Sequence, residues 1–249
     1  MAEEEKIREH AKHALQDLTD KNKKWKDRIK DFAWEVFIII VAVNITLWFH
    51  SWSEKRQERE LEKKFFIGIR SDLAIVNRYL FNDSISYQPQ LRYYDSICTQ
   101  IDEHRIDKVY VDNANTGLLL NNQDFYYDNS RFENFKSSGY LRLIENDSLL
   151  MKIVSLYTID LPWVKSMDEF AHANRQDFVD YIGAKAVDSS GKIIISDLLN
   201  APEAKFKIRN RQGMLSERQR LKWYIMQDIE QVITQIDREL KTRFNYQEK

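Results

Sequence analysis

The sequence predicts an all-α membrane protein with three parts: an amphipathic N-terminal helix, one transmembrane helix that continues into a long helix, and a helical bundle. Glycine and proline number only 6 and 3 among 249 residues, so few positions oppose a helix. Apolar residues recur three or four positions apart along most of the chain, which is the spacing of a helix face. One run of 18 residues, 36–53, carries no charge and is mostly large and apolar.

Residues 1–31 are predicted to form an amphipathic helical arm. Its apolar residues are mostly three or four positions apart: Ile7, Ala11, Ala14, Leu18, Trp25, Ile29 and Phe32. This face either packs in a short coiled coil with neighbouring copies or lies on the membrane surface with Trp25 and the lysines at the headgroups. The acidic start at Glu3 to Glu5 slightly disfavours an anionic membrane there.

Residues 32–52 are predicted to form the transmembrane helix. Eighteen helical residues reach roughly 27 Å, close to the ~30 Å hydrocarbon thickness of a bilayer. Trp34 stands at one end, and Trp48 and Trp52 at the other, as interface anchors do. The run lies too far from Met1 for a cleavable signal peptide and has no cleavage site, so we expect a signal anchor. Basic residues flank it equally, so charge does not orient it, and the short N-terminal tail favours a cytoplasmic N-terminus.

Polar side chains in the span suggest contact with other helices. At about 100° per residue, Glu35, Ala42 and Thr46 share one face, and Asn44 lies opposite. Glu35 stands in the first turn, where it can reach the headgroups, contact a partner helix or belong to an ion path. Asn44 is expected to make an interhelical hydrogen bond in an oligomer.

Residues 53–249 are predicted to form one helical domain. The helix of the span should continue to Phe81, where Asn82-Asp83-Ser84 ends it and caps the next helix. Residues 104–128 read as a polar loop with a short strand at Val109 to Val111. Further helices are expected at 130–136, from the Asn146-Asp147 cap to Pro162, at 164–182, and along an apolar stripe at 221–240.

Two motifs carry a resemblance to a known family. The first is Glu35, an aliphatic run, then Trp52-Ser53-Glu54 and a charged helix. The second is Phe135-Lys136-Ser137-Ser138-Gly139, followed by Leu143-Ile144-Glu145-Asn146-Asp147. Together they resemble an uncharacterised family of bacterial single-span inner-membrane proteins, over roughly residues 32–160. Here Ala33-Trp34 replaces the family's small residues before the glutamate, and the N-terminal arm is longer. The resemblance implies a cytoplasmic N-terminus and a periplasmic C-terminal domain, and it implies no activity.

An aromatic cluster with basic neighbours is one candidate binding site: Tyr126, Tyr127, Arg131, Phe132, Phe135 and Tyr140. It could stack a ligand or contact a partner, and otherwise it is core that joins the loop to the helices.

The other candidate residues do not indicate a specific chemistry. His10 and His13 have no third ligand nearby, and His104 and His172 form a site only if the fold joins them. Ser137-Ser138-Gly139 lacks the frame of a nucleophile elbow, and Asp124 and Asp128 read as surface charges.

Composition narrows the functional classes. The net charge of −1 gives no field that would favour nucleic acid, and we expect neither a metal nor a cofactor. Cys98 is the sole cysteine, so no intrachain disulfide reveals the compartment. The sequence favours a non-enzymatic membrane scaffold or interaction subunit, whose partners are the lipid bilayer and either further copies or other membrane proteins. The alternative is an oligomeric pore with Glu35 and Thr46 toward its axis, and an enzyme ranks third.

Overall fold

The computed structural model describes residues 8–9, 12, 25–112 and 124–246, and it divides the chain into two units, Met1–Leu61 and Glu62–Lys249. Within the described residues, helices account for the secondary structure, with one isolated β-bridge between Val187 and Ile193 and no strand. The predicted all-α class is confirmed. Most of the predicted N-terminal arm, with His10 and His13, lies outside the described residues.

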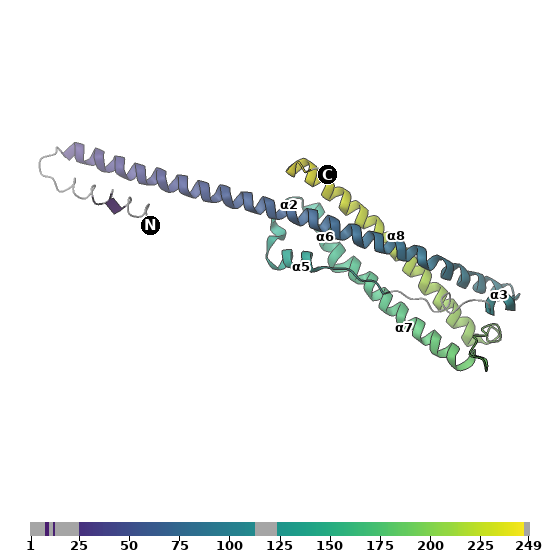
Figure 1. Ribbon diagram of the computed structural model, residues 1–249. Coiled ribbons are helices and arrows are strands. Elements are labelled where there is room, and N and C mark those ends of the chain that lie inside the picture. The colour runs from purple at the N-terminus through teal and green to yellow at the C-terminus, as the bar shows by residue number, and fades with distance from the viewer. Residues whose placement is uncertain (1–7, 10–11, 13–24, 113–123, 247–249) are drawn as a thin grey trace. The chain divides into compact units, whose positions relative to one another are not determined.

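The longest helix, α2, extends over Trp25–Asp102 (Figure 1). In the first unit, its side chains from residue 40 to residue 57 are all exposed to the surroundings. The helix is long and apolar enough to cross a membrane, and none of its most apolar window is buried within the protein. Exposure of an apolar surface on every side of a helix is unfavourable in water.

The predicted helix end at Asn82-Asp83-Ser84 is wrong, because α2 continues through these residues to Asp102. Asparagine, aspartate and serine often cap helices, but here they lie inside one. The Asp83 carboxylate accepts a hydrogen bond from Lys222, 139 residues away, so it does not compete for the local backbone. Pro89 also lies inside α2, where it costs about 3 kcal/mol. Burial of Tyr93, Tyr94 and Ile97 in the following turns offsets that cost.

Gly68 has a packing role in α2. A Cβ atom at this position would lie 2.3 Å from Cζ of Arg131, so a side chain would displace the guanidinium. The missing side chain lets Arg131 lie against α2 and donate from Nε to Asp72 at 2.8 Å. This contact joins α2 to α5, Ser130–Ser137, a helix that the sequence predicted.

The predicted strand at Val109 to Val111 is also wrong, since these residues lie in the short helix α3, Lys108–Asp112. Asp107 caps this helix, because its Oδ1 accepts the backbone N–H of Tyr110 at 3.0 Å. Val111 is buried, and its carbonyl accepts the Tyr93 hydroxyl at 2.6 Å. A cap and one buried side chain therefore outweigh the strand preference of valine.

The middle of the chain folds into three consecutive helical segments. After the 3₁₀ turn η1, Tyr140–Leu143, helix α6 covers Asp147–Ser155, and the predicted cap is confirmed because Oδ1 of Asn146 accepts the Leu149 N–H at 3.1 Å. A π-helical turn, η2, Leu156–Asp160, then leads directly into α7, Leu161–Lys185. The prediction that Pro162 ends or kinks the helix is corrected, because the chain stays helical through it. The wider π turn removes the backbone bond that proline would break.

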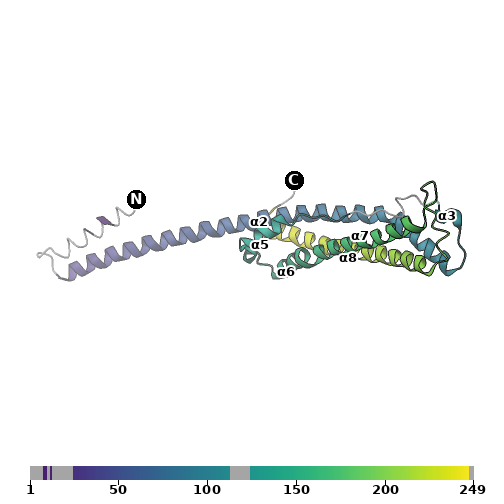
Figure 2. The same ribbon diagram turned by 90° about the horizontal axis from the view of Figure 1, so that it is seen from below.

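The last helix, α8, covers Pro202–Phe244 and begins well before the predicted stripe at 221–240. Within the second unit, α7 and α8 lie side by side along α2 (Figures 1 and 2). Two apolar clusters fill the space between these helices. One gathers Leu73, Leu80 and Ile229 with their neighbours, and the other gathers Tyr94, Ile182 and Leu215 with theirs.

Candidate functional site

Four of the buried charged side chains of the second unit lie together, and we call them the ionic layer: Asp83 of α2, Asp168 of α7, and Arg218 and Lys222 of α8. Their side chains are only 1 to 4% exposed. Along α2 and α8 they fall between residues of the two apolar clusters, after Leu80 and before Tyr87 on α2. Burial of four charges in a helical domain is unusual, because charged groups are seldom fully buried unless paired.

The ionic layer is fully interlinked. Arg218 makes a two-pronged contact with Asp168, from Nε to Oδ1 at 2.6 Å and from Nη2 to Oδ2 at 3.1 Å. Lys222 donates to Oδ2 of Asp83 and lies 3.3 Å from Oδ1 of Asp168. Nη2 of Arg218 also lies 3.6 Å from Oδ2 of Asp83. Each cation thus faces both carboxylates, and two positive charges balance two negative ones.

Protonation in the ionic layer reflects both burial and pairing. Burial lowers the pKa of Lys222, and the nearby charge of Arg218 lowers it further, while Asp168 and Asp83 act in the opposite direction. Burial also disfavours the charged form of Arg218, but the hydrogen bond and charge of Asp168 outweigh it and raise the pKa. The Arg218 guanidinium stacks on the ring of Tyr87, with Cζ 4.0 Å from the ring centre.

A third buried cation, Arg211, extends the polar interior toward the second apolar cluster. Its side chain is fully buried, and Nη1 donates to the backbone carbonyl of Ala171 at 3.0 Å. It also hydrogen-bonds the hydroxyl of Tyr94, whose pKa is raised by burial. Burial lowers the pKa of Arg211. Arg211 therefore links α8 to α7 and α2, the same helices that the ionic layer joins.

The ionic layer fixes how α2, α7 and α8 align along their length. A buried ion pair adds little net stability, because desolvation offsets much of the attraction, but an unpaired buried charge is strongly destabilising. A helix shifted by one turn would leave at least one of the four charges without its partner. The layer thus penalises wrong registers of the three helices.

Sequence reasoning missed the ionic layer, although a signal was present. Asp168 occupies a position on the apolar stripe of α7, four residues after Val164 and three before Ala171. Arg218 and Lys222 similarly interrupt the stripe of α8 between Leu215 and Ile225. A charge on each of three apolar stripes indicates mutual pairing, but only the fold shows which charges meet.

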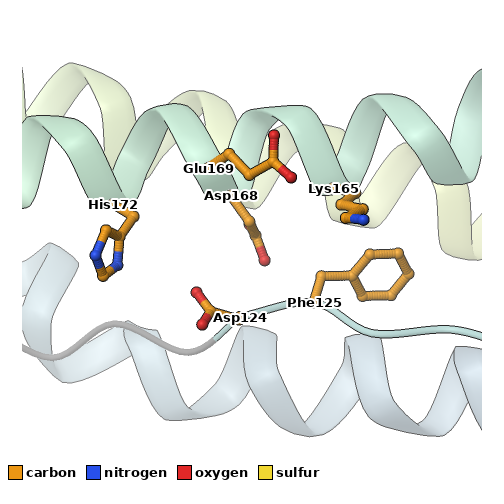
Figure 3. A pocket seen from close by; sticks show the side chains of 6 residues that line it. All are labelled: Asp124, Phe125, Lys165, Asp168, Glu169 and His172. Atoms are coloured by element: carbon orange, nitrogen blue, oxygen red, sulfur yellow. The ribbon is translucent and has the colours of Figure 1, made fainter.

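A cleft of about 370 Å³ opens beside the ionic layer (Figure 3). It is lined by Asp124, Phe125, Lys165, Asp168, Glu169 and His172. Asp168 belongs to both features, and in the close-up its carboxylate points into the cleft toward Asp124. The hydroxyl of Tyr79 donates to the Asp124 carbonyl at 2.5 Å and holds that segment against α2. Asp168 already accepts from Arg218 and Lys222, so it is poorly suited to act as a general base.

Of the predicted histidine pair, only His172 lines this cleft. His104 follows α2 in a left-handed backbone conformation and is exposed. Among the described residues, no group of three or more His, Cys, Asp or Glu side chains could hold a metal ion. The acid pair Asp124 and Asp128 is exposed, as predicted, and Asp128 accepts the backbone N–H of Ser130 at 2.8 Å.

The predicted aromatic cluster is divided between core and surface. Phe132 and Phe135 are buried, where Phe132 stacks on Tyr157 and Phe135 on Phe65. Tyr127 and Tyr140 pack partly buried against the same core. Tyr126 is 78% exposed, and Arg131 is engaged by Asp72.

Two polar side chains of the predicted span, Thr46 and Asn44, form hydrogen bonds within their own helix. The Thr46 hydroxyl donates to the Ala42 carbonyl at 2.9 Å, and Nδ2 of Asn44 donates to the Ile40 carbonyl at 2.7 Å. Glu35 is half-buried, and its Oε2 has no hydrogen-bond partner among the described residues.

The three tryptophans of the predicted span are exposed. Trp34 stacks on Phe37, and Trp52 packs against Phe49 with the Arg56 guanidinium 5.8 Å above its ring. Trp48 contacts Phe49 edge-on. These placements are compatible with interface anchoring, which stays a prediction.

No family model, no curated protein and no solved structure matches this chain. The resemblance to a family of single-span inner-membrane proteins therefore stays a prediction.

Proposed function

We propose that this protein is a single-span membrane scaffold, whose helical domain interacts with further copies or with other membrane proteins. The observation that carries the proposal is the exposure of the apolar part of α2 on every side. A bilayer covers such a surface and leaves the helix backbone satisfied by its own hydrogen bonds. The exposed tryptophans at both ends suit the two interfaces.

The remaining parts of the proposal concern location and orientation. We propose a bacterial inner membrane, with the N-terminus in the cytoplasm and the domain of residues 53–249 in the periplasm. These assignments rest on the resemblance. Reporter fusions at the two termini test them, since a periplasmic reporter should be active only at the C-terminus.

Asn44 supports an oligomeric span. One N–H of its amide bonds the Ile40 carbonyl, while a carboxamide offers a second N–H and two acceptor sites. In lipid these groups gain about 0.6 to 2 kcal/mol from a partner helix, because the hydrocarbon offers them nothing. Thr46 is less suited to such a contact, because its single hydroxyl donor already bonds the Ala42 carbonyl. We therefore expect copies of the span to meet through the face of Asn44.

Cysteine cross-linking tests which face of the span is in contact. Replacing Cys98 with serine first removes the sole cysteine. In this background, Ile40→Cys places a cysteine on the Asn44 face of the span. A separate variant, Ala42→Cys, places one on the face of Glu35 and Thr46. Both variants keep every polar residue of the span. We expect Ile40→Cys to give disulfide-linked dimers in membranes and Ala42→Cys to give few.

Two other outcomes would count against this expectation. Dimers through Ala42→Cys alone would favour the alternative, a pore with Glu35 and Thr46 toward its axis. Ion flux through liposomes, compared between the natural chain and Glu35→Gln, would then test conduction. Dimers through neither position would contradict a span that contacts its own copies.

A further inference from the structure

A surface at the junction of α7 and α8 combines exposed apolar side chains with two neighbouring carboxylates. It consists of Ile159, Asp160 and Trp163 from η2 and the start of α7, and Tyr224 and Asp228 from α8; we call it the acidic-aromatic surface. The apolar members are widely exposed: Ile159 by 60%, Trp163 by 51% and Tyr224 by 56%.

The contacts among these residues place them together. Asp228 and Asp160 both lie close enough to Tyr224 to raise the pKa of its phenol, and Asp228 is hydrogen-bonded to the Tyr224 hydroxyl. Burial raises the pKa of Asp160, and the charge of Asp228 raises it further. Trp163 stands three residues after Asp160 and four after Ile159, which are the spacings at which side chains of a helix are neighbours.

The carboxylates repel each other and lack a cation. Neither Asp160 nor Asp228 forms an ion pair with any residue that the structure describes. The hydrogen bond from Ser155 Oγ to Asp160 at 3.4 Å is long. A cation placed between the two would relieve the repulsion and could also lie on the faces of Trp163 and Tyr224.

Backbone geometry points to the same place. The π-helical turn Leu156–Asp160 ends at this surface, and π turns inside α-helices occur frequently at functional sites. The π turn Leu156–Asp160 places Ile159 at the surface, where its large aliphatic side chain gains no stabilisation from burial in the protein core. Tryptophan and tyrosine beside a charge are also the residues that dominate binding energy at protein interfaces.

We propose that the acidic-aromatic surface binds a partner protein through an arginine or lysine flanked by apolar residues. This inference rests on the proposed scaffold function and names the chemistry of its partner. The basic side chain lies between Asp160 and Asp228, and its apolar neighbours cover Ile159, Trp163 and Tyr224. The two carboxylates select partners that carry a basic side chain, and the apolar contact stabilises the complex.

Site-specific photo-cross-linking in the full chain tests the proposal. The photoreactive amino acid p-benzoylphenylalanine replaces Trp163 in one variant and Phe206 in a control, since Phe206 is an aromatic residue of α8 that is 68% exposed. Illumination of the native membranes should give an adduct only from position 163, with a protein other than this chain. Peptide mapping should place an arginine or lysine within one helical turn of the linked residue.

Neutralising the acids then tests the role of charge. In the cross-linking chain, Asp160→Asn with Asp228→Asn should reduce the adduct about tenfold, the equivalent of one moderate charge contact. Asp228→Glu, which keeps the charge, should retain most of it. The proposal is overturned by no adduct, by an adduct with lipid or a second copy, by a linked peptide without a basic residue, or by an adduct that survives neutralisation. A particle that still exceeds one chain in mass would then leave the scaffold function intact.

Discussion

Asp168→Asn should lower the free energy of unfolding of the helical domain by about 3 to 5 kcal/mol. The change keeps the shape of the side chain but leaves Arg218 and Lys222 buried with Asp83 as their only carboxylate. Urea titration of the full chain in a mild non-ionic detergent, followed by near-ultraviolet circular dichroism, measures the loss. Asp177→Asn is the matched control, because Asp177 lies on the same helix and bonds Lys207 at 2.6 Å with its side chain 61% exposed. It should cost less than about 1 kcal/mol.

A second substitution distinguishes lost charge balance from lost packing. The variant that combines Asp168→Asn with Lys222→Met keeps one buried cation, Arg218, and one buried carboxylate, Asp83. Its buried charges therefore balance again. The combination should recover about 1 to 2 kcal/mol relative to Asp168→Asn alone, as expected for residues within one network. Equal losses for Asp168→Asn and Asp177→Asn, or a combination more damaging than the single change, would contradict the ionic layer as described.

Replacing Val41 and Ile45 together by arginine should remove the protein from membranes. Each arginine near the centre of a span costs about 2.5 to 3.5 kcal/mol of insertion free energy, so the pair costs roughly 5 to 7. Both positions are exposed and apolar in α2, and neither belongs to the apolar clusters of the second unit. Alkaline carbonate extraction measures the outcome, and the variant should appear in the soluble fraction or be degraded.

The control for this experiment changes the same positions without adding charge. Val41→Leu with Ile45→Leu should remain in the membrane pellet, as we expect of the natural chain. If the two arginines also left the protein in the pellet, the apolar stretch of α2 would not be what holds it there.

Features that depend on local sequence could be predicted. The all-α class follows from scarce glycine and proline, and the Asn146 cap follows from a residue type that bonds its own backbone nearby. The apolar stretch of α2 was evident because a long run without charge needs no tertiary information. The same local reasoning failed at Asp83, where a residue typical of a cap is held inside the helix by Lys222.

Features that depend on distant partners could not be predicted. The ionic layer needs residues 83, 168, 218 and 222 to meet, and a charge on each apolar stripe does not specify which charges meet. The acidic-aromatic surface likewise requires Asp160 and Asp228 to lie close across two helices. The aromatic cluster was anticipated as a group, but its division into buried Phe132 and exposed Tyr126 follows from the path of the chain.

The mass of the particle extracted from native membranes tests the proposed function most directly. In the proposed function, the span and the helical domain hold other chains. In a mild detergent, after correction for bound detergent, the protein mass should therefore exceed that of one 29.9 kDa chain by at least another polypeptide. A particle that contains one chain and nothing else, at every detergent concentration tested, would contradict the scaffold function.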